Sequence, residues 1–395
     1  MRNQGNNTSN RMESLDGLRG VAALIVVFTH AMGGLLQPFS WHSITGISHE
    51  QKTILDWVIL NSPIRILFAG SSAVTLFFVL SGFVLTLPWL TGKQLPYRSF
   101  LISRICRIYL PYLAAMTLAA VFAFTLGGEK IPGATDWVNI YAWTNKYSPL
   151  DIPSVILMLG NDYSTWFNNP TWSLVWEMRV SLLFPLLVIP VIRWGLRGTV
   201  AVGLGLWGAY TLGTLVAGLF PAAAAMIGQP QNTFYFAMFF VIGILMACYR
   251  NQIMRITSLG NGIGSLVLVI AGAAVWTIKW GFQPELMRAA GAALILAGCA
   301  SKGLPQRWLE TAPVQWLGRV SYSLYLVHVP IFLIGEYTLH LILPHSMIAL
   351  IVIPVALATS EVFYRLIERP THQLGRYLVK RSATKLGMRV SAEIG

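Results

Sequence analysis

Long apolar runs separated by short polar segments dominate this chain. Ten runs are long enough to cross a bilayer, and they lie at 15–37, 64–91, 108–127, 170–192, 198–220, 232–249, 262–282, 286–301, 320–343 and 346–367. The pattern predicts an all-α integral membrane protein with about ten transmembrane helices and both termini on one side. The second run is longer than one crossing needs and the eighth is shorter, so we expect tilt or a partial crossing there.

The distribution of Lys and Arg predicts the orientation of these spans. With the N-terminus inside, 21 Lys and Arg residues fall on the cytoplasmic side and six on the other. We therefore expect a cytoplasmic N-terminal segment (1–14), a membrane domain (15–368) and a basic cytoplasmic tail (369–395). The tail is expected to lie on anionic lipid.

Composition agrees with a membrane protein and excludes a soluble domain. Hydrophobic residues make up 55% of the 395 residues and charged residues 11%, and the mean hydropathy is +0.61. The net charge of +13 does not indicate nucleic-acid binding, because the basic residues lie between spans. The three cysteines are isolated, so we predict no metal site, no disulfide and no bound cofactor.

The first span carries an arginine and a histidine, Arg19 and His30. Eleven helical steps advance by about 20° past whole turns, so both side chains share one face about 16 Å apart along the axis. Ionisable residues inside a membrane are rare and typically functional. His30 is a candidate general base, because the reference pKa of imidazole lies near neutrality. Asp16 is expected to hold the Arg19 guanidinium, and a structural salt bridge with a satisfied core histidine is an equal alternative.

A basic segment at 97–111, YRSFLISRICRIYLP, is predicted to be a cytoplasmic loop. Arg104 and Arg107 are one helical turn apart and can bind one anion together, and guanidinium suits phosphate. The two arginines are therefore candidate donor-binding residues. Lys93 and Arg98, which lie nearby, are better explained by the positive-inside rule.

The fourth span places a carboxylate, Glu177, in an apolar run together with Trp172 and Ser173. A carboxylate at this depth needs a partner on another span. We expect Glu177 to face a central cavity and bind a polar ligand or a cationic side chain, with Trp172 and Ser173 beside it. A structural bridge between helices is a strong competing interpretation.

Two further segments carry polar groups within spans. Ser81 precedes Gly82, which permits close backbone approach, and Tyr322, Tyr325 and His328 lie in one later span. Ser81 is a candidate donor-binding residue, and the other three are candidate acceptor or cavity residues. Residues of these types also serve in ordinary helix packing.

Two long loops on the outer side, 38–63 and 128–169, are rich in aromatic residues among Asn, Asp and Ser. Such loops can bind sugars by stacking and hydrogen bonding, and an interfacial aromatic belt is an equally good explanation. The aromatic residues concerned are Trp41, Trp57, Trp137, Tyr141, Trp143, Tyr147, Tyr163 and Trp166.

Taken in order, these segments resemble the acyltransferase 3 family of multipass membrane O-acyltransferases, which modify polysaccharides and other extracytoplasmic acceptors. The resemblance covers nearly the whole chain. It rests on LDGLRG with a histidine eleven residues after its arginine, FFVLSGF at 77–83, the Arg-x2-Arg spacing, TWSLVWE at 171–177, LGRVSYSLYLVHVP at 317–330 and IERP at 367–370.

The resemblance implies roles for specific residues. Arg19 and His30 correspond to the essential pair, Arg104 and Arg107 to the cytoplasmic Arg-x2-Arg motif, and Glu177 to the glutamate of the fourth segment. Many members carry an aromatic pair at the third and fourth positions after that glutamate, where this chain has Val180 and Ser181. Some members carry an appended SGNH-type domain, and this chain ends soon after its last predicted span.

The family resemblance implies that the enzyme moves an acyl group, most simply acetyl, from cytoplasmic acyl-CoA to a hydroxyl group of an extracytoplasmic glycan or glycolipid. His30 would act as general base or as an acyl relay. The implied location is the bacterial cytoplasmic (inner) membrane. The rival hypotheses are a proton-coupled transporter that uses the same His, Arg and Glu at the midplane, and a noncatalytic partner of a glycan-assembly complex.

Overall fold

The computed structural model describes residues 9–35, 62–144, 152–159, 166–226, 229–257, 262–278 and 284–385. Helices and the links between them account for all of these residues, and no strand occurs among them. The predicted all-α fold is therefore confirmed for the described part of the chain. Trp41, Trp57, Tyr147 and Tyr163, which were predicted to lie in outer loops, fall outside it, as do both chain ends (1–8 and 386–395).

Seven helical segments within the described residues are long and apolar enough to cross a membrane. Their apolar sequences explain why they form helices, because a helix satisfies all its own backbone hydrogen bonds in lipid. The helices concerned are α1 (Ser9–Leu35), α4 (Gly70–Leu90), α5 to α6 (Tyr97–Leu126), α10 (Thr171–Leu219), α12 (Gln231–Cys248), α17 (Ala312–Leu339) and α18 with its extension (His345–Ser382).

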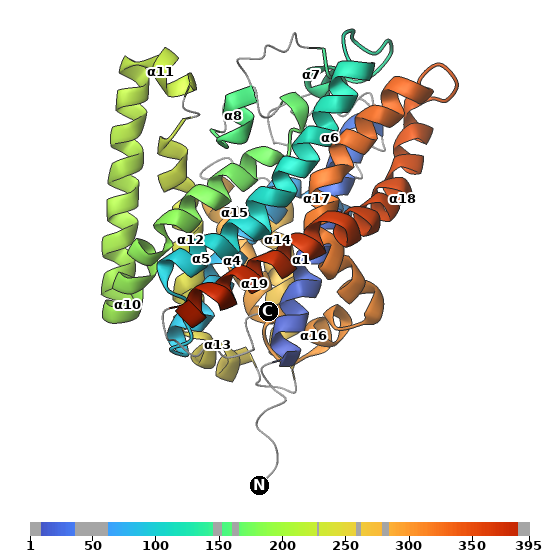
Figure 1. Ribbon diagram of the computed structural model, residues 1–395. Helices are drawn as coiled ribbons and strands as arrows, with labels where there is room; N and C mark the ends of the chain where they lie inside the picture. The colour runs from blue at the N-terminus through green and yellow to red at the C-terminus, as the bar shows by residue number, and fades with distance from the viewer. Residues whose placement is uncertain are drawn as a thin grey trace.

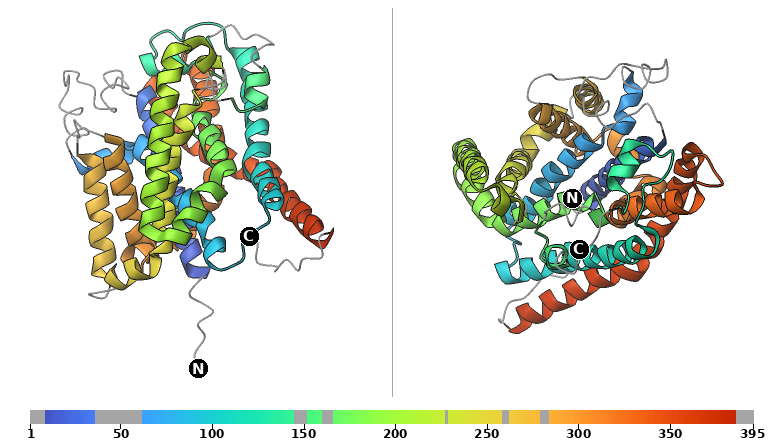
Figure 2. Two further views of the ribbon diagram at one scale, coloured as in Figure 1. Left: turned by 90° about the vertical axis from the view of Figure 1, so that its left-hand side faces the viewer. Right: turned by 90° about the horizontal axis from the view of Figure 1, so that it is seen from above.

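One of these helices, α10, contains two of the predicted spans. It has 49 residues and turns sharply at Gly195, whose backbone angles are φ 55° and ψ −128°. Glycine fits this turn because the positive φ carries no steric penalty without a Cβ. The predicted runs 170–192 and 198–220 lie on either side of the turn. The second half stands at the edge of the bundle (Figure 2). Its apolar side chains, such as those of Trp207 and Leu212, are exposed.

The predicted runs 262–282 and 286–301 correspond to shorter helices, α14 (Ile263–Thr277) and α15 (Pro284–Cys299). They have 15 and 16 residues and pack against each other. A transmembrane helix needs about 20 residues, and both helices are shorter than that. The number of ten spans therefore stays a prediction.

The segment predicted to be a loop at 97–111 is helical, so that expectation was wrong. α5 (Tyr97–Arg104) continues through a π-helical turn, η3 (Ile105–Tyr109), into α6 (Leu110–Leu126). The basic residues suggested a loop, but Pro96 precedes the helix and Pro111 occupies the first turn of α6, where proline is tolerated. Arg104 and Arg107 therefore lie on a continuous helix with a π-turn between its two parts.

A second π-turn lies near the C-terminus. α18 (His345–Phe363) passes through η5 (Tyr364–Glu368) into α19 (Arg369–Lys385) without a break. α19 packs against α5 and η3, and it crosses the lower front of the bundle (Figure 1). Much of the basic segment predicted to be a tail is thus a helix that contacts the membrane bundle.

The short helices mark the two ends of the bundle (Figure 1). We call the lower one the α13 end and the upper one the α7 end. At the lower end lie α13 (Arg250–Thr257) and α16 (Leu304–Leu309), and at the upper end lie α7 (Asp136–Tyr141), α8 (Ile152–Ile156) and α11 (Pro221–Met226). A 3₁₀ helix, η2 (Pro63–Phe68), precedes α4.

At the centre of the bundle, α1 packs against α4, α17 and α18. Its contact with α17 is backbone to backbone. A Cβ atom at Gly20 would lie 2.5 Å from the amide nitrogen of Gly318, so only glycine fits there. Gly82 of α4 approaches the Phe240 carbonyl of α12 in the same way, which confirms the predicted close approach at this residue.

Candidate active site

His30 pairs with a second histidine, His328, across the contact between α1 and α17. The Nδ1 atom of His30 lies 2.8 Å from Nε2 of His328, and the two rings stack 5.0 Å apart at 13°. Both side chains are buried, with 8% and 3% of their surface exposed. Both residues are candidate site residues from the sequence, and the fold brings them into direct contact.

The hydrogen bonds of this pair fix its tautomers. Nδ1 of His328 lies 3.0 Å from the Leu324 carbonyl oxygen, which can only accept, so Nδ1 must donate. In a neutral His328 the other nitrogen, Nε2, then accepts a hydrogen bond from Nδ1–H of His30. A neutral His30 therefore carries its lone pair on Nε2, the atom that a general base uses.

Trp137 of α7 covers the other face of the His30 ring. The ring centroids are 5.4 Å apart at 22°, and Trp137 is 1% exposed. Its indole N–H is buried and has no hydrogen-bond partner within the described part of the chain. Because a buried donor without a partner is costly, this N–H is a candidate for a ligand contact.

On the flank of His328, Tyr325 and Ser173 form a small polar group. The Tyr325 hydroxyl lies 2.7 Å from the Ser173 hydroxyl and donates to the Pro170 carbonyl at 3.1 Å. The Tyr325 ring is 5.9 Å from the His328 ring. Of the predicted cavity residues, these two therefore lie beside the histidine pair.

Arg19 lies about 16 Å below His30 on the same helix, by the rise of eleven residues. It pairs with Asp16 at 3.3 Å, as predicted from their spacing. Its charge also interacts with those of Arg107 and Glu177. Glu177 in turn accepts a hydrogen bond of 3.0 Å from Ser81. These charges occupy the level between the histidine pair and the α13 end.

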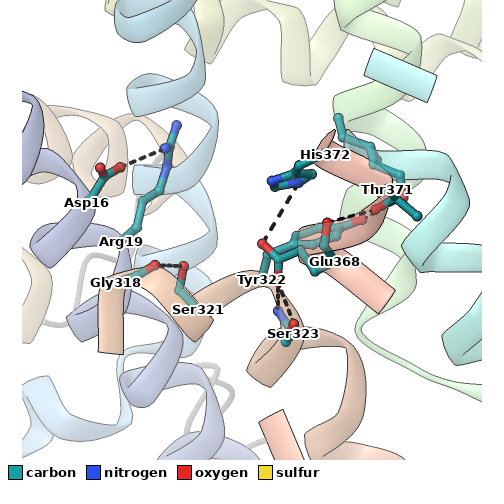
Figure 3. A network of polar contacts seen from close by, with 10 residues as sticks. Asp16, Arg19, Gly318, Ser321, Tyr322, Ser323, Glu368, Thr371 and His372 are labelled. Atoms are coloured by element: carbon teal, nitrogen blue, oxygen red, sulfur yellow. Dashed lines mark hydrogen bonds and ion pairs between the residues drawn. The ribbon is translucent and has the colours of Figure 1, made fainter. Parts of the chain in front are cut away.

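Next to this level, Glu368 of η5 is tied to α17 (Figure 3). Its Oε2 accepts hydrogen bonds from the backbone and the hydroxyl of Ser323, at 3.1 Å and 2.5 Å. Its Oε1 lies 3.9 Å from Nε2 of His372, and the two form an ion pair only when the imidazole is protonated. Thr371 donates to the Glu368 carbonyl at 2.9 Å. This cluster joins the end of α18 to the start of α19.

Tyr322 supports the π-turn that carries Arg107. Its hydroxyl donates to the Ile108 carbonyl at 2.8 Å. A π-turn leaves carbonyl groups that the regular helix pattern does not satisfy. Tyr322, a predicted cavity residue, thus acts here by holding the position of η3.

A cavity of about 1370 Å³ opens at the α13 end, between α4, α5, α10, α13, α15 and α19. Arg104 and Arg107 both line it, and their role in binding the donor stays a prediction. Four more cationic side chains line it as well, Lys93, Arg250, Arg376 and Lys380. Most of the remaining lining is apolar. Among the described lining residues, α1 contributes Leu15, so the cavity ends below the level of Arg19 and His30.

Aromatic rings form part of the cavity wall. Phe100 stacks with Phe184 at 6.3 Å and with Tyr97 at 6.4 Å, and all three residues line the cavity. The guanidinium of Arg104 lies over the Phe100 ring, 5.6 Å from its centroid. A planar ligand group and an anionic one can therefore be bound side by side on this wall.

Two predicted residues have other partners. Ser81, predicted to bind the donor, is held by Glu177 and does not appear in the described cavity lining. Trp172 packs on Phe236, with ring centroids 5.6 Å apart, in an aromatic cluster between α10 and α12.

Comparison with known protein families identifies the family of this chain. The family described as acyltransferase domain, acyltransferase 3, matches residues 12–365. The chain belongs to this acyltransferase family. The resemblance noted in the sequence is thereby confirmed, and so is the prediction that the protein is an acyltransferase enzyme of a multipass membrane type. An appended SGNH-type domain is not evident.

Two curated relatives of this acyltransferase are also named as acyl-transferring enzymes. The chain is 27% identical to the acyltransferase MdmB of Streptomyces mycarofaciens over 92% of each chain. It is 22% identical to the peptidoglycan O-acetyltransferase OatA of Listeria monocytogenes, over 92% of this chain and 56% of that protein. No solved structure was found to match the chain.

Sequence reasoning on this acyltransferase missed three residues of the site. Trp137 was named only as a loop aromatic, and no sequence signal connects α7 to His30. Arg376 and Lys380 were assigned to a basic tail. Their spacing of four residues placed them on one helix face, and that was the available signal.

Proposed function

We propose that this protein is a membrane O-acyltransferase that moves an acyl group, most simply acetyl, from cytoplasmic acyl-CoA to a hydroxyl group of an extracytoplasmic glycan or glycolipid. The observation that carries the proposal is the order of groups along the bundle. A cationic cavity lies at the α13 end, and the buried His30–His328 pair lies toward the α7 end.

Acyl-CoA fits the cavity on three counts. The molecule carries phosphates, which suit the arginines, and an adenine ring, which suits the aromatic wall of Phe100 and Phe184. Its pantetheine arm is long and thin and can reach beyond the cavity. To react, the thioester would pass the level of Arg19 and approach His30, while the charged nucleotide stays at the α13 end.

In direct transfer, Nε2 of His30 accepts the proton of the acceptor hydroxyl as its oxygen attacks the thioester carbonyl. The carbonyl oxygen gains negative charge, and the buried N–H of Trp137 would donate to it. The C–S bond then breaks, and the leaving thiolate takes the proton from His30. In the alternative, Nε2 itself attacks the thioester and passes the acyl group on.

His328 is a positioning residue in this scheme. It accepts from Nδ1–H of His30 and so keeps the lone pair on Nε2. Arg19, which shares the helix face of His30, would orient the anionic part of the donor, with Asp16 holding its guanidinium. Glu177 and Ser81 would complete the polar level below the histidine pair.

The nature of the acceptor is supported by a relative. The Listeria monocytogenes protein is named for O-acetylation of peptidoglycan, a glycan polymer outside the membrane. We therefore propose a glycan or glycolipid acceptor, and the bacterial cytoplasmic membrane as the location. The family match favours this proposal over the transporter hypothesis.

The test replaces His30 in a strain that lacks the gene. We expect His30→Ala to restore no O-acylation of surface glycans, measured by mass spectrometry, at a membrane abundance equal to wild type. His340→Ala is the matched control, because His340 caps the C-terminus of α17 and bonds to that helix at the Glu336 carbonyl. Wild-type acylation by the His30→Ala protein would disprove the assignment.

A further inference from the structure

One face of α19 lines the cavity at the α13 end. The residues of α19 that line the cavity are His372, Gly375, Arg376, Val379 and Lys380. Their spacing of three and four residues puts them on a single helix face. Arg381, the next residue along, is exposed and lies off this face.

Close packing fixes this face against the π-turn η3. A Cβ atom at Gly375 would lie 2.9 Å from the Cβ of Cys106, so the two backbones approach as closely as glycine allows. Cys106 itself lies between Arg104 and Arg107 in the chain. The cations of α19 are thus held in register with those of the Arg-x2-Arg motif.

The cations of α19 extend the basic lining outward. Arg376 lies about 6 Å and Lys380 about 12 Å along the helix from His372, by the rise per residue. The side chains of Arg376 and Lys380 are exposed, as is that of Arg107, whereas His372 is partly buried beside Glu368. The lining therefore continues from Arg104 of α5 and Arg107 of η3 to a second pair of positive charges on α19, which descends toward the α13 end (Figure 1).

Acyl-CoA carries phosphate at two separate places. The diphosphate joins pantetheine to the nucleoside, and a single phosphate stands on the 3′ carbon of the ribose, beyond the diphosphate as seen from the thioester. With the thioester directed toward His30, the 3′-phosphate is the outermost anion of the donor. Its dianion matches two cations on the outer part of the cavity.

We propose that Arg376 and Lys380 of α19 bind the 3′-phosphate of the acyl-CoA donor, and that this helix makes the enzyme select CoA over donors without that phosphate. The inference rests on the proposed function. The sequence predicted that Arg376 and Lys380 lie in a basic tail on anionic lipid. In this proposal they recognise the nucleotide part of the donor instead.

The experiment measures binding of CoA and of 3′-dephospho-CoA to the purified full-length protein by calorimetry. We expect the wild type to bind CoA at least 10-fold more tightly. The double variant Arg376→Gln/Lys380→Gln should bind CoA about 10-fold more weakly than wild type and bind 3′-dephospho-CoA unchanged. Arg381→Gln on the same helix is the matched control and should keep the wild-type preference.

Unchanged binding of 3′-dephospho-CoA also shows that the double variant is folded. If the double variant keeps the full preference for CoA, the role of α19 is disproved and the proposed function stands. If the wild type binds neither compound, the acyl-CoA donor is wrong and the inference fails with it. A single Arg376→Gln variant that loses several-fold of the preference would support the proposal independently.

Discussion

At the scale of single residues, the fold gives a neutral His30 a defined tautomer. A chain of two hydrogen bonds runs from the Leu324 carbonyl through His328 to His30 and determines which nitrogen carries the lone pair. Trp137 holds the ring from the other side. The imidazole is thereby oriented before any substrate arrives, which reduces the reorganisation needed during the reaction.

Replacing His328 tests this orientation. We expect His328→Phe to lower kcat by roughly 10²-fold, because His30 loses the acceptor that selects its tautomer, with little change in the KM for acyl-CoA. His328→Gln should recover part of the rate, since an amide oxygen can accept the same hydrogen bond. Steady-state kinetics of CoA release measures both constants. A drop in thermal stability with kcat unchanged would instead indicate a purely structural histidine.

Trp137→Phe removes the indole N–H and keeps an aromatic ring on His30. If the N–H stabilises the developing oxyanion, kcat should fall by about 10²-fold. Trp143→Phe provides the comparison, because the Trp143 N–H donates to the Phe167 carbonyl and has a structural partner. That variant should lose about 1 kcal/mol of stability and little kcat. Equal kcat values for the two variants would rule out the proposed role of Trp137.

At the scale of elements, glycine contacts set the register between α1 and α17. Gly20 of α1 faces the backbone of Gly318 in α17, and Gly318 faces the backbone of Asp16 in α1. Small residues let the two helices approach closely, as is common in membranes. About three turns farther along both helices, this close approach brings His30 to His328. The histidine pair therefore depends on packing far from it.

Gly20→Ala should disturb the site from a distance. The added methyl group meets the α17 backbone, so we expect a loss of about 1–3 kcal/mol of stability together with reduced kcat. Gly208→Ala in α10 has open space at the same position and should be neutral or slightly stabilising. Thermal unfolding in detergent and CoA-release assays check both variants. Full activity and stability in Gly20→Ala would contradict the register argument.

Most of the long helices in the structure were predicted from the apolar runs of the sequence. Apolar runs predicted the long helices, and helical spacing placed Asp16, Arg19 and His30 correctly on α1. The π-turns were not predictable, because they change hydrogen bonding without a clear change in composition. Basic residues at 97–111 suggested a loop, yet most of these residues lie in helices. Positive charge reports which side of the membrane a segment faces, and it does not report local conformation.

Contacts between distant segments could not be read from the sequence. Trp137 reaches His30 only because α7 folds over the end of α1, and Arg376 reaches the cavity only because α19 packs on η3. Such arrangements depend on tertiary packing, which no periodicity encodes. The pairing of His30 with His328, across 298 residues, belongs to the same class.

At the scale of the whole molecule, the site is divided between the two ends of the bundle. The six lining cations lie at the α13 end, and α7 covers His30 at the other. The orientation from the distribution of Lys and Arg puts the α13 end in the cytoplasm. Donor and acceptor then approach the reaction from opposite sides.

This orientation can be tested with single cysteines in a variant whose three native cysteines are replaced by serine. A cysteine at Arg381, at the α13 end, should react with a membrane-impermeant maleimide only after the cells are permeabilised. A cysteine at the exposed Lys130, between α6 and α7, should react in intact cells. The opposite labelling pattern would reverse the predicted topology and with it the side from which the donor binds.

The separation of the cationic lining from His30 has a consequence for control of the reaction by metabolism. The cavity contacts would be made to the nucleotide part of the donor, which is the same in acyl-CoA and in the free CoA that remains after transfer. Both molecules would therefore compete for the cavity with similar affinity. The rate of glycan modification would then follow the ratio of the two cytoplasmic pools, so that modification slows when the supply of acyl groups falls even if total CoA is constant.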